Sequence, residues 1–107
     1  MANTFKNAGV AIGTSATTIY TTPSATTAVI HAIYLSNVHG SATATVSIYV
    51  TDTSSGSDFY IGKNLTIPAG ATIVLDKPVN LEATDILKAL AADASSAEAF
   101  CSVLEIS

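Results

Sequence analysis

Apolar and hydroxyl-bearing residues alternate along the middle of this chain. Between Thr43 and Asp52, the aliphatic residues Val46, Ile48 and Val50 occupy every second position. Such alternation predicts a β-strand with one buried face, because successive side chains of a strand point to opposite sides of the sheet. Similar short stretches recur along the chain, separated by Gly, Pro, Asn and Asp, which favour turns. The pattern therefore predicts a protein built mainly from short strands.

Turn signals separate the predicted strands. Thr22-Pro23 ends one strand, and Asn37–Ser41 joins two others, so we expect a hairpin at the second of these turns. Pro78 favours an edge position for the strand that it begins, since proline cannot donate a hydrogen bond to a neighbouring strand. In chain order, strands are expected at Val10–Gly13, Thr17–Thr21, Ala28–Asn37, Thr43–Thr51, Phe59–Ile61, Asn64–Ile67, Ala71–Leu75, Pro78–Leu81 and Ala99–Ile106.

The strand predicted at Ala28–Asn37 is apolar on both faces. Strict alternation places Val29, Ile33 and Leu35 on one face together with His31. The opposite face then carries Ile30, Ala32 and Tyr34. A strand with two apolar faces is typical of the centre of a sheet that is covered on both sides. We expect a central strand here, with a neighbouring subunit as one of its covers.

The segment from Thr84 to Ala94 fits two kinds of element. Its Leu and Ala residues are good helix formers, and Thr84 is a suitable N-cap for a helix. A strand would instead place Leu87, Ala89 and Ala91 on one face. The spacing of the surrounding strands favours the second alternative, and we predict a strand.

Eight or nine short strands without a long helix indicate an all-β fold. We predict a single-domain antiparallel β-sandwich of about eight strands over residues 1–107, with a jelly-roll or immunoglobulin-like arrangement. A chain of 107 residues is long enough for one core. Residues 1–8 are rich in Asn and carry isolated Phe5 and Lys6, so we expect an N-terminal arm there rather than a strand.

Composition excludes several classes of function. The net charge is −4, with four Lys and no Arg, which argues against a nucleic-acid surface. No apolar run is long enough to span a membrane. The N-terminus lacks a basic region followed by an apolar stretch, so we expect a protein made and folded in a cytoplasm. Cys101 is the single cysteine and cannot form an internal disulfide, and we expect it to be buried as a small hydrophobic residue.

Residue types that carry chemistry are present but do not form a recognised motif. His31 and His39 have no Cys or further His at a metal-ligand spacing. Ser36, His39 and Asp52 are the residue types of a hydrolytic triad, but no Gly-x-Ser-x-Gly surrounds the serine. Asp52 and Asp58 bracket a loop that lacks the order of a calcium-binding loop. We predict solvated turns at these positions and no catalytic or metal site.

The remaining candidates are equally weak. Glu82 and Asp85 resemble an acid/base pair only in type, because they lie three residues apart in one turn. Asn64 begins a glycosylation sequon, which has little force without a secretory signal. A stacking platform for carbohydrate remains open as an alternative, and it would use Tyr34, Tyr49 and Tyr60. We therefore predict no cofactor and no enzymatic activity.

One succession of segments extends over nearly the whole chain: a strand ending in Thr-x-Pro, a strand ending in Ser-Asn, a hairpin and a late Leu-Glu-x-x-Asp turn. The segments are Gly13–Pro23, Ile33–Asn37, Thr45–Val50, Ile67–Gly70, Leu81–Asp85 and Ser102–Ile106. This succession resembles the small all-β virion structural proteins of tailed bacteriophages, including cyanophages. Thr84 stands where such proteins often have glycine before the aspartate.

The resemblance implies a virion role and transfers no catalytic residue. The leading hypothesis is a capsid decoration, or cement, protein that binds the outside of a phage head as a small cyclic homo-oligomer such as a trimer. Its partners would be its own copies and the major capsid protein or another virion protein. A surface with little charge suits such close packing of copies. A tail or fibre component and a carbohydrate-binding module for host attachment are the alternatives.

Overall fold

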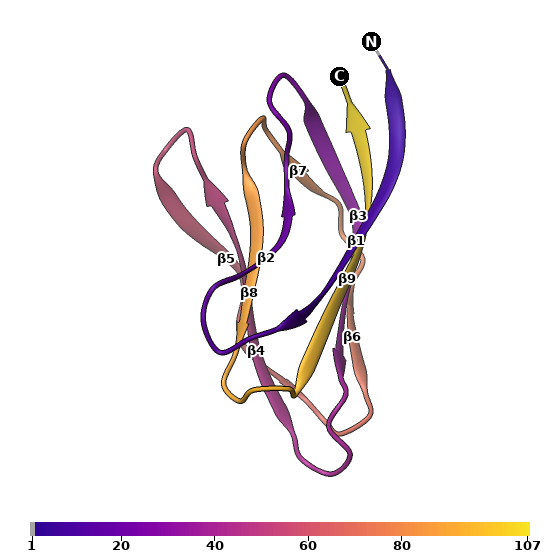
Figure 1. Cartoon of the computed structure of the whole chain (residues 1–107), viewed down its shortest axis with the longest axis vertical. Helices are drawn as coiled ribbons and strands as arrows, with labels where there is room; N and C mark the ends of the chain where they lie inside the picture. Colours follow the sequence, from indigo (N-terminus) through magenta and orange to yellow (C-terminus); the bar gives the residue numbers. More distant parts are fainter. Residues whose placement is uncertain (1) are drawn as a thin grey trace.

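The computed structural model describes residues 2–107, which form nine β-strands (Figure 1). Their bounds are β1 Asn3–Ile12, β2 Thr17–Thr21, β3 Thr27–Asn37, β4 Ala44–Asp52, β5 Ser57–Ile67, β6 Thr72–Leu75, β7 Val79–Leu81, β8 Ile86–Ala91 and β9 Ala97–Ile106. Among the described residues, no helix is long and apolar enough to cross a membrane.

The strands form two antiparallel sheets that pack face to face. One sheet has the order β1-β9-β3-β6, with β7 also paired to β3, and the other has the order β2-β8-β4-β5. Figure 1 shows the first sheet on the right and the second on the left. The predicted all-β sandwich is confirmed.

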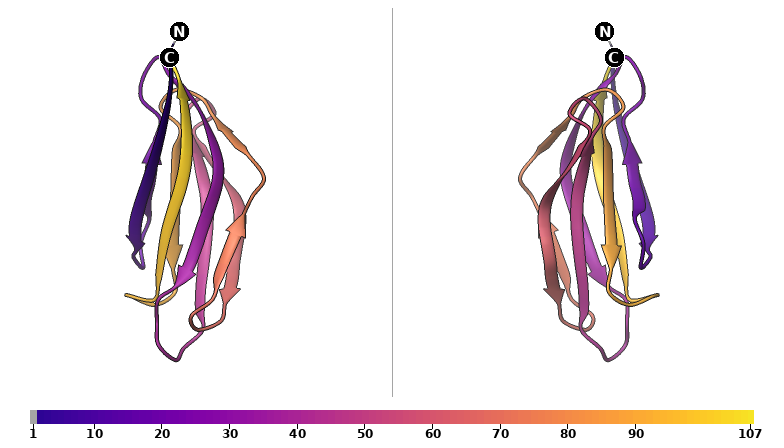
Figure 2. Two further views of the ribbon diagram at one scale, coloured as in Figure 1. Left: turned by 90° about the vertical axis from the view of Figure 1, so that its right-hand side faces the viewer. Right: turned by 90° about the vertical axis from the view of Figure 1, so that its left-hand side faces the viewer.

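The strand order is that of a jelly roll. β6 pairs with Ile33–Ser36 of β3, and β7 pairs with Ala28–Ile30 of the same strand. The two therefore serve as one edge strand that is interrupted around Pro78, and Figure 2 shows the chain bulging outward between them. Counted as one, they give eight strands in the orders 1-8-3-6 and 2-7-4-5, the double Greek key of a jelly roll.

Aliphatic residues from the inner faces of both sheets fill the core. Val46 and Ile48 of β4 are fully buried, as the alternation between Thr43 and Asp52 predicts. The largest buried side chains from the other strands are Ile12, Ile30, Ile33, Leu35, Ile67, Leu81, Leu87 and Val103. The segment predicted as a strand at Thr84–Ala94 contains β8, whose Leu87, Ala89 and Ala91 face the core.

The predicted facing of the Ala28–Asn37 strand is wrong in its first half. Ile30 pairs with Val103 and Ala32 with Ser102, so His31 is an extra residue in a β-bulge. The bulge shifts the alternation by one residue and turns Ile30, Ile33 and Leu35 inward together. The central position of β3, between β9 and the β6–β7 edge, is confirmed.

The hairpin expected at Asn37–Ser41 is also wrong. β3 and β4 belong to different sheets, so the connection crosses from one sheet to the other. The buried Asn37 side chain stabilises this crossing, because its Nδ2 donates to the carbonyls of Ala42 and Ile67, both at 2.8 Å. A buried side-chain amide supplies here the hydrogen bonds that a hairpin ladder would supply.

The N-terminal arm expected over residues 1–8 is a strand from Asn3 onward, and Met1 lies outside the described residues. β1 pairs with β9 along its whole length, from Asn3 opposite Ile106 to Ile12 opposite Ala97. The polar composition of this segment reflects an edge strand with two accessible faces rather than a free arm. Both termini lie at the same end of the sandwich, where Ala2 and Ser107 exchange backbone hydrogen bonds.

Candidate functional site

The residues of the hydrolytic triad considered above are kept apart. His39 lies in the β3–β4 connection, and its Nδ1 accepts from the backbone N–H groups of Ser41 and Ala42 at 3.1 Å. Asp52 lies at the opposite end of β4, nine residues of about 3.3 Å each away. Ser36 shares a hydrogen bond of 3.0 Å with Thr72. Each of these side chains has its own local partner, and they form no nucleophile–base pair.

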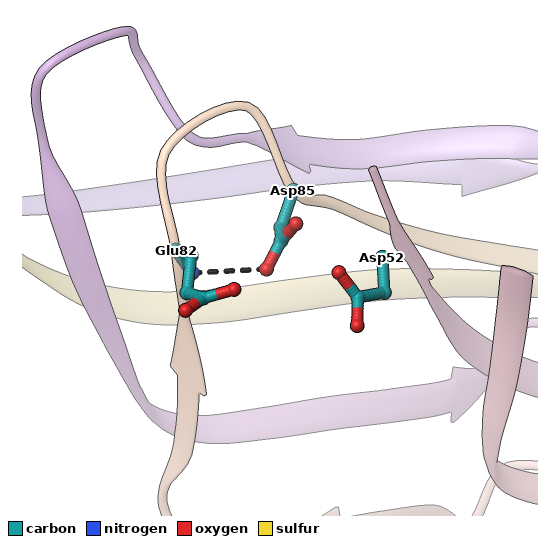
Figure 3. A group of neighbouring side chains, drawn as sticks. All are labelled: Asp52, Glu82 and Asp85. Carbon is teal, nitrogen blue, oxygen red and sulfur yellow. Dashed lines mark hydrogen bonds between the residues drawn. The ribbon is translucent and has the colours of Figure 1, made fainter. Parts of the chain in front are cut away.

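Three carboxylates meet at the end of the sandwich that holds the termini (Figure 3). Asp52 ends β4, while Glu82 and Asp85 lie in the turn between β7 and β8. One oxygen of each carboxylate lies within 4.8 Å of the others. In the sequence, Asp52 is near Asp58 and Glu82 is near Asp85, but the fold brings Asp52 to the second pair. Asp58 instead accepts a hydrogen bond of 2.7 Å from the Thr51 hydroxyl.

Asp85 is the buried member of this cluster, at 5% exposure. Its Oδ2 accepts from the Glu82 N–H at 2.9 Å, and its Oδ1 accepts from the Thr53 N–H at 3.1 Å. The Asp85 side chain therefore ties the β7–β8 turn to the β4–β5 turn. Asp52 is partly buried, and its bonds from Ser54 hold the pKa of the Asp52 carboxyl below its usual value.

Carboxylates this close together are the ligand type that hard cations such as Ca²⁺ prefer. Both oxygens of Asp85 already accept hydrogen bonds from the chain, however, and one Asp52 oxygen accepts two from Ser54. These bonds explain the cluster as a latch between two turns. The cluster is the one place in residues 2–107 where three or more His, Cys, Asp or Glu side chains lie close enough to hold a metal ion.

The latch depends on a turn with unusual backbone geometry. Thr84 has φ 71°, in the left-handed region that glycine adopts most readily. Glycine would adopt this geometry without the steric cost that a threonine side chain brings. The Thr84 hydroxyl lies 2.6 Å from that of Thr53, and the Thr84 N–H donates to the Thr22 carbonyl at 3.0 Å. Side-chain and backbone hydrogen bonds thereby join the β7–β8 turn to the β4–β5 turn and to the β2–β3 connection.

A polar contact links the two sheets near the same end. Tyr20 of β2 donates its hydroxyl to Oε2 of Glu105 on β9, and Lys6 of β1 lies 3.3 Å from Oε1 of the same carboxylate. Glu105 is buried, whereas Lys6 is half exposed. Burial, followed by the hydrogen bond and the charge of Glu105, raises the pKa of Tyr20. The contact therefore joins the two sheets.

Cys101 is fully buried in the core, which confirms its expected role as a small hydrophobic residue. Burial raises the pKa of the Cys101 thiol, so the neutral form is favoured. Asn64, the sequon residue, has φ 54° on β5, and its N–H donates to the Ser47 hydroxyl at 3.0 Å. Neither residue is arranged for chemistry.

The three tyrosines considered as a stacking platform lie on different sheets. Tyr49 and Tyr60 contact each other on the β4–β5 side, with tilted rings whose centroids are 5.0 Å apart. Tyr34 lies on β3 of the other sheet and contacts Phe100 of β9, with centroids 6.5 Å apart. The three rings therefore do not form one platform, and Tyr34 lies beside Phe100 instead.

The outer edge of β5 exposes three consecutive apolar residues. Phe59 is 57% exposed, Tyr60 49% and Ile61 38%. Next to Ile61 lies an apolar groove of about 230 Å³, which β6, the β6–β7 connection and Val79 line on the other side. An eleven-residue strand with one free edge presents unpaired N–H and C=O groups beside these side chains. The sequence signal for this edge is the run of three apolar residues, Phe59, Tyr60 and Ile61. Successive residues of a strand point to opposite faces, so one buried face cannot hold all three.

The fold is similar to proteins of two assembled structures. A chain from the acidic stable capsid of Helicobacter pylori bacteriophage KHP30 superposes with a TM-score of 0.60 and 16% identity, covering 100% of this chain and 94% of that one. A chain from the disulfide-linked pili of Bacillus endospore appendages superposes with a TM-score of 0.56 and 15% identity, covering 99% and 87%. No protein-family model and no curated protein matches the sequence. At these identities the likeness establishes the fold.

Proposed function

We propose that this protein is a non-enzymatic structural component of a phage virion, and that it decorates the outside of the head. The observation that carries the proposal is the β5 edge, with Phe59, Tyr60 and Ile61 exposed beside an apolar groove. Proteins that remain monomeric protect long edge strands with charges, prolines or bulges that turn the edge away. This edge does carry Lys63 and a bulge near Gly62, where the pairing with β4 shifts register. Phe59, Tyr60 and Ile61 nevertheless stay exposed, so a neighbouring chain is the natural cover.

The other surfaces agree with a role in assembly. Several of the described charged side chains are used in local contacts, as in the Asp85 latch and the Glu105 contact. A net charge of −4 on 107 residues permits copies to pack closely with little repulsion. The similarity of the fold to a capsid chain and to a pilus chain supports a subunit that self-assembles.

We infer that the assembled form is a small cyclic homo-oligomer, such as a trimer, which binds the major capsid protein or another virion protein. A cyclic oligomer multiplies many weak contacts with the capsid lattice and so raises the apparent affinity. The site of action is the virion, after synthesis in the host bacterial cytoplasm.

The test combines oligomeric state with binding to heads. Purified protein is measured by light scattering, mixed with undecorated phage heads and sedimented. Phe59→Lys combined with Ile61→Lys should shift the oligomer toward monomer and reduce head-bound protein at least about tenfold, a change of roughly 1.4 kcal/mol. Val38→Lys is the matched control, since Val38 is 51% exposed in the β3–β4 connection, and it should behave as the wild type.

A monomeric wild type that never sediments with heads would reject the decoration role. Labelling of whole virions then separates the alternatives of the same class. Label on the tail would favour a tail or fibre component, which the similarity to a pilus chain also supports.

A further inference from the structure

The outer face of the β1-β9-β3-β6 sheet carries an aromatic row next to a polar row. Cross-strand pairing places Phe100 opposite both Gly9 and Tyr34. Two residues before Phe100 on β9, Glu98 pairs with Ala11 of β1 on one side and with Ser36 of β3 on the other. Because paired residues of an antiparallel sheet share a face, these side chains all point outward.

Small residues on β1 leave a hollow beside the two rows. Gly9 and Ala11 face Phe100 and Glu98 with little or no side chain, and the hollow has a volume of about 380 Å³. A Cβ at Gly9 would lie 3.1 Å from Cδ1 of Phe100, so the phenyl ring extends over β1 where glycine allows it. The volume falls at the lower end of the range for small-molecule sites.

The walls of the hollow combine two aromatic rings with several polar groups. Phe100 is 45% exposed and Tyr34 is 38% exposed, and their rings are tilted by 44°. The exposed Glu98 carboxylate has no hydrogen-bond or ion-pair partner among residues 2–107. Ser36 lines the hollow, and its hydroxyl bonds to that of Thr72, which leaves acceptor lone pairs free toward solvent.

Charge narrows the class of ligand. The four lysines lie elsewhere: Lys6 pairs with Glu105, Lys63 and Lys88 belong to strands of the other sheet, and Lys77 lies in the β6–β7 connection. Glu98 is thus the one charged side chain that lines the described hollow. A carboxylate without a nearby cation accepts hydrogen bonds from neutral hydroxyl or amide donors and repels anionic ligands.

We infer that this hollow binds a neutral saccharide. The pyranose ring has an apolar C–H face that packs on Phe100 and Tyr34, and hydroxyl groups at its rim that donate to Glu98 and exchange hydrogen bonds with Ser36. A purely apolar partner would leave the Glu98 carboxylate buried without a donor. The alternation of aromatic and polar rows therefore fits an amphipathic ligand better than the apolar core of a protein interface. This inference uses other residues than the proposed assembly through β5.

The test titrates the isotope-labelled full chain with the neutral probes D-galactose, D-mannose and N-acetyl-D-glucosamine. Backbone amide NMR detects binding. The anionic trisaccharide 3′-sialyllactose is the charged probe. At least one neutral probe should shift the amides of Gly9, Tyr34, Glu98 and Phe100 with a Kd of about 1–10 mM, typical of a shallow site for a small ligand. The sialylated probe should bind at least about tenfold more weakly than the best neutral probe.

Variants connect the signal to the hollow. Phe100→Ala and Glu98→Ala should each weaken binding about tenfold or more, and both side chains are exposed enough that the spectrum should otherwise keep its native dispersion. Phe5→Ala is the matched control, since Phe5 is an exposed aromatic residue of β1 that does not line the hollow, and it should bind as the wild type. Head binding by Phe100→Ala should stay unchanged, which separates this inference from the proposed function.

Three results would overturn the inference. No shift of these amides up to about 50 mM of every neutral probe would exclude the site. Equal affinity of the wild type and Phe100→Ala would place the ligand elsewhere. Shifts of the same amides on raising the protein concentration without sugar would assign the face to a second copy of the chain.

Discussion

Removing the Tyr20 hydroxyl tests whether the contact between Tyr20, Glu105 and Lys6 holds the two sheets together. In the Tyr20→Phe variant the ring stays in place, while Glu105 loses the hydroxyl donor that reaches it from the opposite sheet. Lys6 remains 3.3 Å from the same carboxylate. The perturbation therefore isolates one hydrogen bond between the sheets.

The expected magnitude follows from burial. A hydrogen bond to a charged acceptor contributes about 1.5–3 kcal/mol, and Glu105 is only 8% exposed, so solvent replaces the donor poorly. The Lys6 ammonium is half exposed, and such ion pairs contribute about 0.2–1 kcal/mol. Tyr20→Phe should thus destabilise the fold by about 1.5–3 kcal/mol, and Lys6→Met should have a clearly smaller effect.

Urea unfolding of the wild type, Tyr20→Phe, Glu105→Gln and the double variant gives the coupling between the two side chains. We expect a coupling of at least about 1 kcal/mol, together with unchanged m-values. Coupling below about 0.3 kcal/mol, or a larger loss from Lys6→Met than from Tyr20→Phe, would refute the assignment of the hydroxyl as the main link.

The same contact predicts a dependence on alkaline pH. Burial raises the pKa of Tyr20 above the value of about 10 in an unfolded chain, so the folded state holds this proton more tightly. The resulting stability is fully present below pH 10 and is lost as the pH rises above it. The wild type should therefore lose stability more steeply above pH 10 than Tyr20→Phe does, and parallel curves would contradict the assignment.

Three further predictions follow from the fold. Ile48→Asp should abolish cooperative unfolding because it buries an unpaired carboxylate, whereas Thr45→Asp on the outer face should change stability by about 0.5 kcal/mol or less, as measured by circular dichroism melts. Deletion of residues 2–8 removes the β1 partners of Cys101–Ile106 and should lower the free energy of unfolding in urea by about 3 kcal/mol or more. A truncated chain as stable as the wild type would show that these residues are a free arm after all. Thr84→Gly should raise stability by about 0.5–1 kcal/mol, and a loss would show that its hydroxyl contact outweighs the left-handed backbone.

Local alternation was sufficient to predict the fold class and most strands. Val46 and Ile48 are buried as expected, and the segment containing Leu87, Ala89 and Ala91 is a strand although its residues favour a helix. Sheet context overrides helix propensity there, because β8 lies between β2 and β4 and gains two sets of hydrogen bonds. Alternation failed where the chain departs from regular pairing, as at the His31 bulge.

Long-range contacts explain the errors in the candidate sites. Asp52 and Asp85 are thirty-three positions apart, and only the jelly-roll order brings the β4–β5 and β7–β8 turns together. Tyr49 and Tyr60 meet because β4 and β5 are neighbours, while Tyr34 is assigned to the other sheet by the crossing after Asn37. No feature of the sequence near these residues specifies that crossing, since Asn37 acts through carbonyls of Ala42 and Ile67.

The outer face of β9 shows why a functional surface is harder to predict than a core. Alternation places Phe100 and Leu104 on one side of the strand and Cys101 and Val103 on the other, and both sides are apolar. Hydrophobicity alone would bury the larger side chains, since they remove more apolar area from water. The sandwich instead buries the smaller ones, because Phe100 lies across Gly9 on the outside of the sheet. Phe100 is thereby left accessible beside Glu98. The proposed binding surface exists because the larger apolar side chains of β9 lie on its outer face and the smaller ones on its inner face.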